Sequence, residues 1–170
     1  MRALDLFRRA AERGHAEAQA QAAFLFNKSG YMEDAVDYYR KSAEQGNANG
    51  QFGLGASYLS GEGVKEDLIE ARKWITLAAK QGHVGAISVM ANAYIEGGLG
   101  LSDAERQGPE ALHWIRLAAD NNFRNAITEL AEAYRSGKYG LVPDQKKADE
   151  LDSKLNNKKE VKKKSSKIRR

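Results

Sequence analysis

Three histidines are the side chains of this sequence best suited to acid–base or metal chemistry, because imidazole titrates near neutral pH and readily ligates metals. His15 and His83 each follow a glycine in a recurring motif, and His113 precedes a tryptophan. The positions equivalent to the first two hold Asn47 and Phe123, which cannot do the same chemistry. No histidine pair has zinc-protease spacing. We therefore expect structural roles for all three, with no catalytic residue and no metal site.

Other features that suggest chemistry are equally weak. The glycine-rich stretches 60–63 and 98–100 lack the preceding strand that a phosphate-binding loop requires. The carboxylates of Asp103 and Glu105 do not have the alternating spacing of a calcium loop. Cysteine is absent, which excludes disulfides and thiolate metal sites. The sequence thus predicts a protein that is not an enzyme, needs no cofactor and has no small-molecule substrate.

Charge is distributed unevenly along the 170 residues. Residues 158–170 contain six lysines, two arginines and one glutamate, a net charge of +7, so the remaining residues carry −3 of the total +4. The folded body is therefore not expected to be a basic nucleic-acid platform. No apolar run approaches the roughly 20 residues of a membrane span, and the N-terminus does not have a signal-peptide pattern. These features favour a soluble, cytoplasmic chain.

The basic tail is a block of like charge that we expect to be disordered on its own. Its basic residues are Lys158, Lys159, Lys162, Lys163, Lys164, Lys167, Arg169 and Arg170. A solubilising extension is one interpretation. A nuclear-import or nucleic-acid patch and an anionic-membrane patch are the alternatives, although the tail has no aromatic residue for base stacking.

An internal repeat organises the rest of the chain. The motif at Ala10–Ala18 recurs from Ser42, from Ala78 and, degraded, from Ala118, at spacings of 32, 36 and 40 residues. Two mostly aromatic columns flank it, 20 residues apart in every copy. They are Leu6, Tyr38, Trp74 and Trp114 before the motif, and Phe26, Tyr58, Tyr94 and Tyr134 after it. One turn of each repeat is therefore constant in length, and the other tolerates insertions.

The residues before each motif show the apolar periodicity of a helix with one buried stripe. Gly14, Gly46, Gly82 and Asn122 then stand where a helix end favours positive φ. Small residues recur four and nine positions later, as in Gly50 and Gly55, and predict close helix contacts. The pattern does not explain a further glycine at position 53.

These features resemble the Sel-one-like repeat (SLR), a branch of the tetratricopeptide-like superfamily. The resemblance rests on Gly46-Asn47-Ala48, Gln51, Leu54-Gly55, Tyr58, Gly61-Glu62-Gly63-Val64, Ala71, Trp74 and Ala78-Ala79. It implies an all-α fold, a right-handed α-α superhelical solenoid of antiparallel helix pairs. Residues 1–157 would form it, with a half repeat at 1–13 and helix pairs from about 14, 46, 82 and 122. The half repeat leaves Leu6, Phe7 and Ala10 without their usual neighbour, so we expect either a longer array or contact of this edge with a partner or a second copy.

The resemblance also implies a role as a protein-binding scaffold or adaptor, because tetratricopeptide relatives hold peptides in the groove lined by the first helix of each pair. The corresponding columns vary between repeats, as expected for a binding face on a uniform scaffold. Candidate partner-binding residues in them are Glu17, Phe24, Asn27, Asn49, Phe52, Ser88, Asn92, Asn125, Thr128, Glu132 and Arg135. The same columns contain Ala20, Ala56, Leu59, Gly85 and Ile95. Phe52 and Leu59 could instead pack against neighbouring helices.

Two other function classes are weaker. A helical-repeat RNA binder would need a basic groove, whereas the body carries −3. A hydrolase, as proposed for some cysteine-rich relatives, would need a nucleophile–base pair, and none is evident. Binding of nucleic acid or an anionic surface through the basic tail remains the alternative to a protein adaptor.

Overall fold

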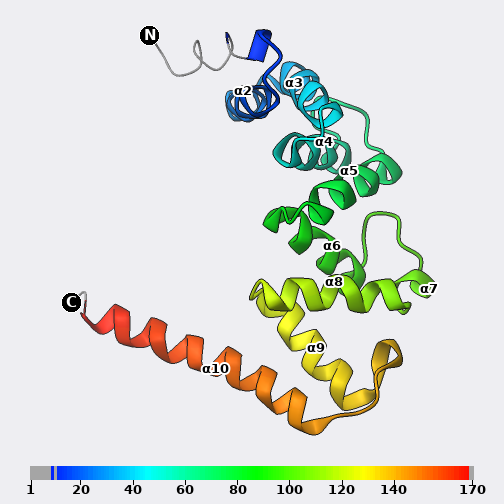
Figure 1. Ribbon diagram of the computed structural model, residues 1–170, viewed down its shortest axis with the longest axis vertical. Helices are drawn as coiled ribbons and strands as arrows, with labels where there is room; N and C mark the ends of the chain where they lie inside the picture. Colours follow the sequence, from blue (N-terminus) through cyan, green and yellow to red (C-terminus); the bar gives the residue numbers. More distant parts are fainter. Residues whose placement is uncertain (1–8, 10, 169–170) are drawn as a thin grey trace. The chain divides into compact units, whose positions relative to one another are not determined.

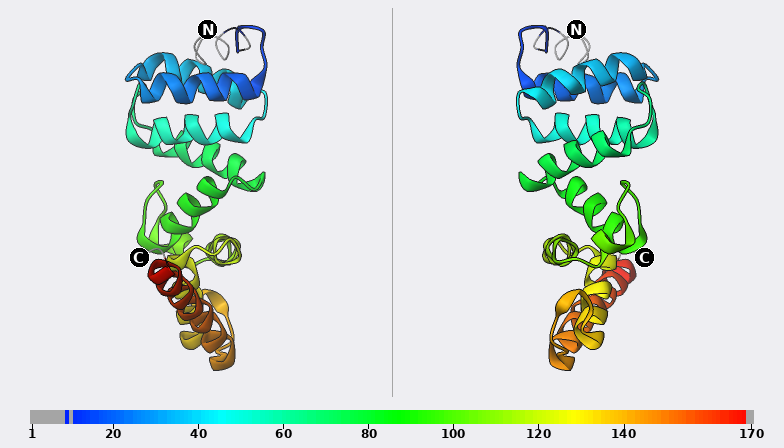
Figure 2. Two further views of the ribbon diagram at one scale, coloured as in Figure 1. Left: turned by 90° about the vertical axis from the view of Figure 1, so that its left-hand side faces the viewer. Right: turned by 90° about the vertical axis from the view of Figure 1, so that its right-hand side faces the viewer.

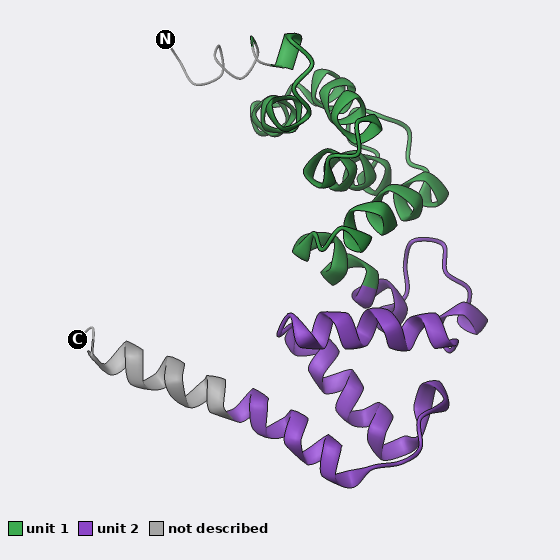
Figure 3. Ribbon diagram, viewed as in Figure 1, with its two compact units in different colours: residues 1–90 green, residues 91–170 purple. Residues whose placement is uncertain are grey.

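The protein was examined as a computed structural model that describes residues 9 and 11–168, with side chains placed for residue 9 and residues 11–156. The described part is helical throughout its regular structure and contains no strand, which confirms the all-α fold class. In chain order the elements are α2 (Ala16–Lys28), α3 (Met32–Glu44), α4 (Ala48–Ser60), α5 (Leu68–Lys80), α6 (Val84–Glu96), α7 (Asp103–Arg106), α8 (Pro109–Asp120), α9 (Arg124–Ser136), the 3-10 turn η1 (Lys138–Gly140) and α10 (Gln145–Ile168) (Figure 1). The chain divides into two compact units, residues 1–90 and 91–170, with the boundary inside α6 (Figure 3).

The constant turn of each repeat is built on a left-handed residue, as the sequence predicts. φ is +87° at Gly14, +83° at Gly46 and Gly82, and +66° at Asn122. After α3, the N–H of Gly46 donates to Ala43 and that of Asn47 donates to Ser42, the paired bonds of a Schellman motif. The same pair follows α5 and α8. Because the residue after the left-handed position is already the N-cap, the next helix begins at once.

Small residues allow the helices of residues 11–90 to stack closely in successive layers (Figure 2). A Cβ atom on Gly50 would lie 2.3 Å from Ser42 Oγ, and one on Gly55 would lie 2.6 Å from Ile75 Cγ1. Ser42 Oγ in turn donates to the Ala16 carbonyl at 2.7 Å, so α2, α3 and α4 meet at this point. The predicted close contact at these two glycines is confirmed.

The variable turn is anchored to the aromatic column in each repeat. The carbonyl oxygen of the column residue accepts a backbone N–H from beyond the turn, from Tyr31 to Phe26 (3.0 Å), Asp67 to Tyr58 (3.0 Å) and Asp144 to Tyr134 (2.8 Å). In the long third turn, Arg106 supplies the bond instead. Its Nε donates to Tyr94 at 3.2 Å and its Nη2 donates to Ile95 at 2.8 Å. A guanidinium at the end of α6 therefore compensates for the insertion.

The two ends of the chain depart from the central pattern. Residues 1–8 and 10 lie outside the described part, and with them the expected half-repeat contacts of Leu6, Phe7 and Ala10. Asp144 caps α10 by accepting the Lys147 N–H at 3.1 Å. The disorder expected for residues 158–170 on their own stays a prediction, and the backbone of α10 is helical through Ile168. The physical basis is that no glycine or proline follows Pro143 and that lysine and glutamate are good helix formers.

No helix in the described residues is both long and apolar enough to cross a membrane.

Candidate functional site

A groove of about 750 Å³ lies along the first helices of two successive pairs, α2 and α4. Glu17 in the first turn of α2 bonds to Asn49 in the first turn of α4, so the two helices start at the same end of the groove. The lining residues are Ala20, Gln21, Phe24, Asn27, Tyr39, Asn49, Phe52, Gly53, Ala56, Ser57, Leu59, Ser60, Glu62 and His83. The structure thus brings together most of the columns predicted for these two helices.

The apolar wall of the groove is formed mainly by two phenylalanines. Phe24 on α2 is 54% exposed, which is high for a large apolar side chain. Phe52 on α4 is half-buried and stacks on His83, with ring centroids 4.4 Å apart. Phe52 therefore does both things considered from the sequence, since it packs against a neighbouring side chain and also lines the groove. Leu59 and two alanines complete the wall.

Tyr39 enters the groove from α3, across Gly53 of α4. A Cβ atom on Gly53 would lie 2.2 Å from Tyr39 Cε1, so the tyrosine ring occupies the space that a side chain at position 53 would fill. This contact explains the glycine that the sequence pattern leaves unexplained. Tyr39 is only 8% exposed, and its hydroxyl has no hydrogen-bond partner within the described part of the chain. Burial raises the pKa of the Tyr39 phenol, which keeps it a neutral donor at neutral pH.

The carboxylate of Glu17 is not part of the groove lining, but it is hydrogen-bonded to two lining residues, Gln21 and Asn49, at the end where α2 and α4 begin. It accepts hydrogen bonds from Gln21 Nε2 at 2.9 Å, from Asn47 Nδ2 at 2.8 Å and from Asn49 Nδ2 at 3.3 Å. These bonds hold the pKa of the Glu17 carboxyl below its ordinary value, so the group is ionised at neutral pH. Glu17 and Asn49 were predicted as separate partner contacts, and the structure joins them to each other.

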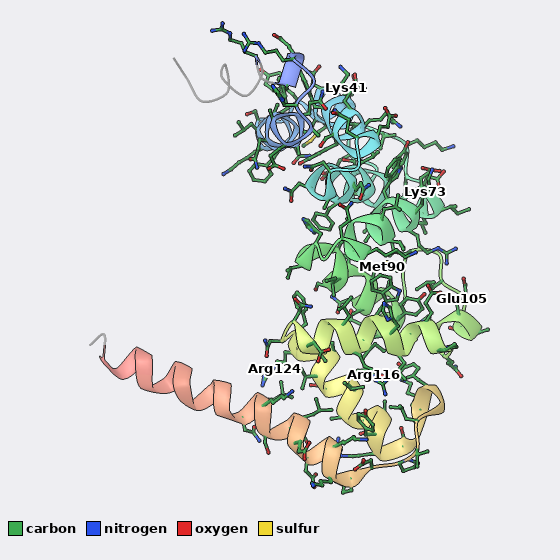
Figure 4. The ribbon with its side chains drawn as sticks, viewed as in Figure 1. Lys41, Lys73, Met90, Glu105, Arg116 and Arg124 are labelled. Atoms are coloured by element: carbon green, nitrogen blue, oxygen red, sulfur yellow. The ribbon has the colours of Figure 1, made fainter. Side chains whose placement is uncertain are left out.

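The opposite end of the groove carries Glu62, which follows the last turn of α4. No lysine or arginine is among the lining residues. Lys41 of α3 and Lys73 of α5 (Figure 4) are outside the lining, and each lies over an aromatic ring of its own helix. The acidic groups of the groove and its edge are therefore Glu62 in the lining and Glu17 beside it.

His83 is a structural residue at the edge of the groove. Its Nδ1 accepts the Ala86 N–H at 3.1 Å, which caps α6 in the way that Asn47 caps α4. Burial lowers the pKa of His83 and favours the neutral ring that this cap needs. A Cβ atom on Gly85 would lie 3.1 Å from the His83 ring and 3.2 Å from Phe52, so Gly85 leaves room for their stacking.

The remaining predicted residues lie on α6 and α9. Ser88 and Asn92 are half-buried on α6, whereas Asn125, Thr128, Glu132 and Arg135 are exposed on α9. Asn125 Nδ2 lies 3.4 Å from Glu96 Oε1, and Arg135 pairs with Glu132 and with Asp152 of α10. Asn125, Glu132 and Arg135 are thus already engaged with side chains of their own chain. The basic side chains of the tail lie outside the described side chains.

A separate polar cluster joins α9 to η1. Glu129 accepts hydrogen bonds from Lys138 Nζ and, at 2.6 Å, from Tyr139 Oη. Burial acts to raise the pKa of Glu129, but these two bonds outweigh it and the pKa is lowered. Tyr139 has a φ of +58°, so the cluster holds a strained turn. Among the described residues, no group of three or more histidine, cysteine or acidic side chains could hold a metal ion.

Sequence reasoning missed three notable lining residues, Tyr39, Glu62 and His83. By periodicity Tyr39 belongs to the apolar stripe of its helix, and His83 was considered only as the residue after a motif glycine. A signal for Tyr39 was present, because a glycine inside a helix costs about 1 kcal/mol relative to alanine and calls for a close neighbour. Nothing in the sequence marked Glu62 as a groove residue, since it lies in a turn that is part of the repeat pattern.

The Sel1 repeat family model matches residues 1–15, 16–47, 48–83, 90–123 and 125–148, which is most of the chain. No curated protein matches the chain. Among solved structures, one similar chain is a Sel1 repeat protein from Oxalobacter formigenes, with 31% identity and a TM-score of 0.69 over 82% of this chain and 57% of that one.

Another similar structure is a protective antigen present in uropathogenic Escherichia coli strains, which displays an SLR fold. It is 27% identical with a TM-score of 0.78, over 91% of this chain. This chain spans a third of the length of that antigen and somewhat over half of the Oxalobacter protein. The matching repeats and the matching folds together show that the chain belongs to the Sel1 repeat family.

Proposed function

We propose that this protein is a scaffold or adaptor that binds a segment of a partner protein in the groove between α2 and α4, without catalysis. Sel1 repeats commonly mediate protein–protein interaction. The observation that carries the proposal is Phe24, a large apolar side chain left more than half exposed beside a groove. Exposed aromatic side chains next to a concave surface are frequent anchors of protein interfaces.

The polar lining supports a peptide ligand. The side-chain oxygens of Gln21, Asn27 and Asn49 have no donor within the described part of the chain, so they are available to accept hydrogen bonds. Tyr39 adds a hydroxyl that has no partner among the described residues. An apolar wall combined with a few oriented polar groups is typical of a recognition site.

An affinity capture from native lysate tests this function. We would compare the full chain with Phe24→Ala and with Ile69→Ala, a matched control because Ile69 is 72% exposed on α5, outside the groove. Proteins retained by the full chain and by Ile69→Ala should be lost with Phe24→Ala. Equal recovery by both variants would contradict the groove assignment.

A second arm tests the basic tail as the alternative binding element. The chain ending at residue 157, with nuclease added, should retain the same proteins if the repeats bind them. Loss of all captured proteins on removal of residues 158–170, or on nuclease treatment, would assign binding to the tail and to nucleic acid or another polyanion.

A further inference from the structure

The polarity of the groove changes along its length, and this change restricts the kind of segment that can occupy the groove. Its centre is apolar, with Phe24 and Phe52 on the wall and the Tyr39 ring across Gly53 on the floor. Acidic side chains mark both ends, with Glu62 in the lining beyond the end of α4, and Glu17 outside the lining but bonded to the lining residue Asn49 at the start of α4. Since α4 has 13 residues, the two carboxylates are separated by about 20 Å at a rise of about 1.5 Å per residue.

The groove also lacks balance between hydrogen-bond donors and acceptors. The amide nitrogens of Gln21 and Asn49 are already directed to Glu17, and that of Asn27 lies 3.4 Å from Met32 Sδ. The amide oxygens of the same residues are left to accept. An occupant that supplies N–H groups would satisfy these oxygens.

From these observations, and resting on the proposed function, we infer that the groove binds an extended peptide segment of a partner protein in which an apolar anchor residue lies between two basic residues about six positions apart. An extended chain advances about 3.3 Å per residue, so about six residues span the 20 Å between the carboxylates. An extended backbone offers free N–H groups to the amide oxygens, whereas a helix has used its own.

The Tyr39 hydroxyl gives the anchor a defined position. The residue is more than nine-tenths buried, it lines the groove, and its hydroxyl has no partner among the residues that the structure describes. Within the described residues, Trp114 Nε1 is the buried side-chain polar atom that lacks both a partner and solvent contact, so the Tyr39 hydroxyl must remain accessible. It donates to a backbone carbonyl of the occupant beside the anchor residue, while the anchor side chain packs between the two phenylalanines.

A selection experiment tests the pattern directly. A phage-displayed library of random twelve-residue peptides is selected on the full chain, and the enriched peptides are synthesised and measured by fluorescence polarisation. We expect a consensus with one large apolar residue flanked by lysine or arginine, about six positions apart. An acidic consensus, or no consensus, overturns the inference.

Three variants tie the selected peptides to the groove. Tyr39→Phe removes only the hydroxyl and should weaken binding about two- to tenfold, whereas Tyr31→Phe, an exposed tyrosine outside the groove lining, should leave it unchanged. Glu62→Gln should weaken binding by roughly two- to fivefold. Equal affinities of the chain and of Tyr39→Phe would contradict the floor contact.

Failure of this inference can be separated from failure of the proposed function. Peptides that lose affinity with Phe24→Ala but lack the basic–apolar–basic pattern would overturn the inference and leave groove binding standing. Peptides that bind Phe24→Ala as well as the unaltered chain would overturn both.

Discussion

Replacing Gly53 by alanine tests whether Tyr39 truly occupies the side-chain space above α4. Helix propensity alone favours alanine over glycine by about 1 kcal/mol. Against this, the new methyl group would lie 2.2 Å from Tyr39 Cε1, where ordinary contact needs 3.4–4 Å, so the ring must move by more than 1 Å. Overpacking of this kind typically costs about 1–3 kcal/mol. We therefore expect Gly53→Ala to destabilise unit 1 by up to about 2 kcal/mol.

A double-mutant cycle provides the control for this prediction. The equivalent positions in the next two repeats hold Ile75 and Ile115, so Tyr39→Ile places a native residue type there and removes the ring. In that background Gly53→Ala should be neutral or stabilising by up to about 1 kcal/mol. The coupling, measured from urea unfolding by circular dichroism, should be at least about 1 kcal/mol. A stabilising effect in the unaltered chain, or the same effect in both backgrounds, would refute the reasoning.

Further expectations concern the capping histidine and the variable turns. Because burial lowers the pKa of His83 below its ordinary 6.5, the neutral ring contributes stability above that pH, and this contribution is lost as pH falls through the lowered pKa. His83→Asn should flatten the fall of the urea midpoint below about pH 6.5. Gly63→Ala, which would place a Cβ 2.3 Å from a backbone carbonyl of α3 at a φ of +70°, should cost about 2–5 kcal/mol, against about 1–2 kcal/mol for Gly30→Ala, where φ is +86° but the space is open. Arg106→Ala should release the turn at residues 97–108, seen as faster limited proteolysis there than in the unaltered chain.

Features set by the repeat were predictable from the sequence. The left-handed residues at 14, 46, 82 and 122 follow from spacing, because each pair needs the same sharp turn at the same place. The columns on α2 and α4 that line the groove follow from helical periodicity once the repeat is aligned. The turn residues and the groove columns both depend on residues that are close together in one helix or turn, and the spacing of residues in the sequence shows such relations directly.

Features that depend on two helices at once were not predictable. Glu17 bonds to Asn49, which lies 32 residues away, and nothing in the sequence distinguishes a pair that bonds internally from two residues free for a partner. Arg106 reaches the α6 carbonyls only because the long turn folds back. Tyr39 belonged to a buried stripe by periodicity, and its presence in the groove depends on a glycine in the following helix.

The central claim is that a partner segment binds over Phe24. The most direct measurement is the dissociation constant of one captured partner for the full chain, for Phe24→Ala and for Ile69→Ala, by isothermal titration calorimetry. Truncating an interface anchor typically costs about 1–2 kcal/mol or more, so Phe24→Ala should weaken binding at least five- to thirtyfold, with less than a twofold change for Ile69→Ala. Equal constants for all three chains would contradict the account.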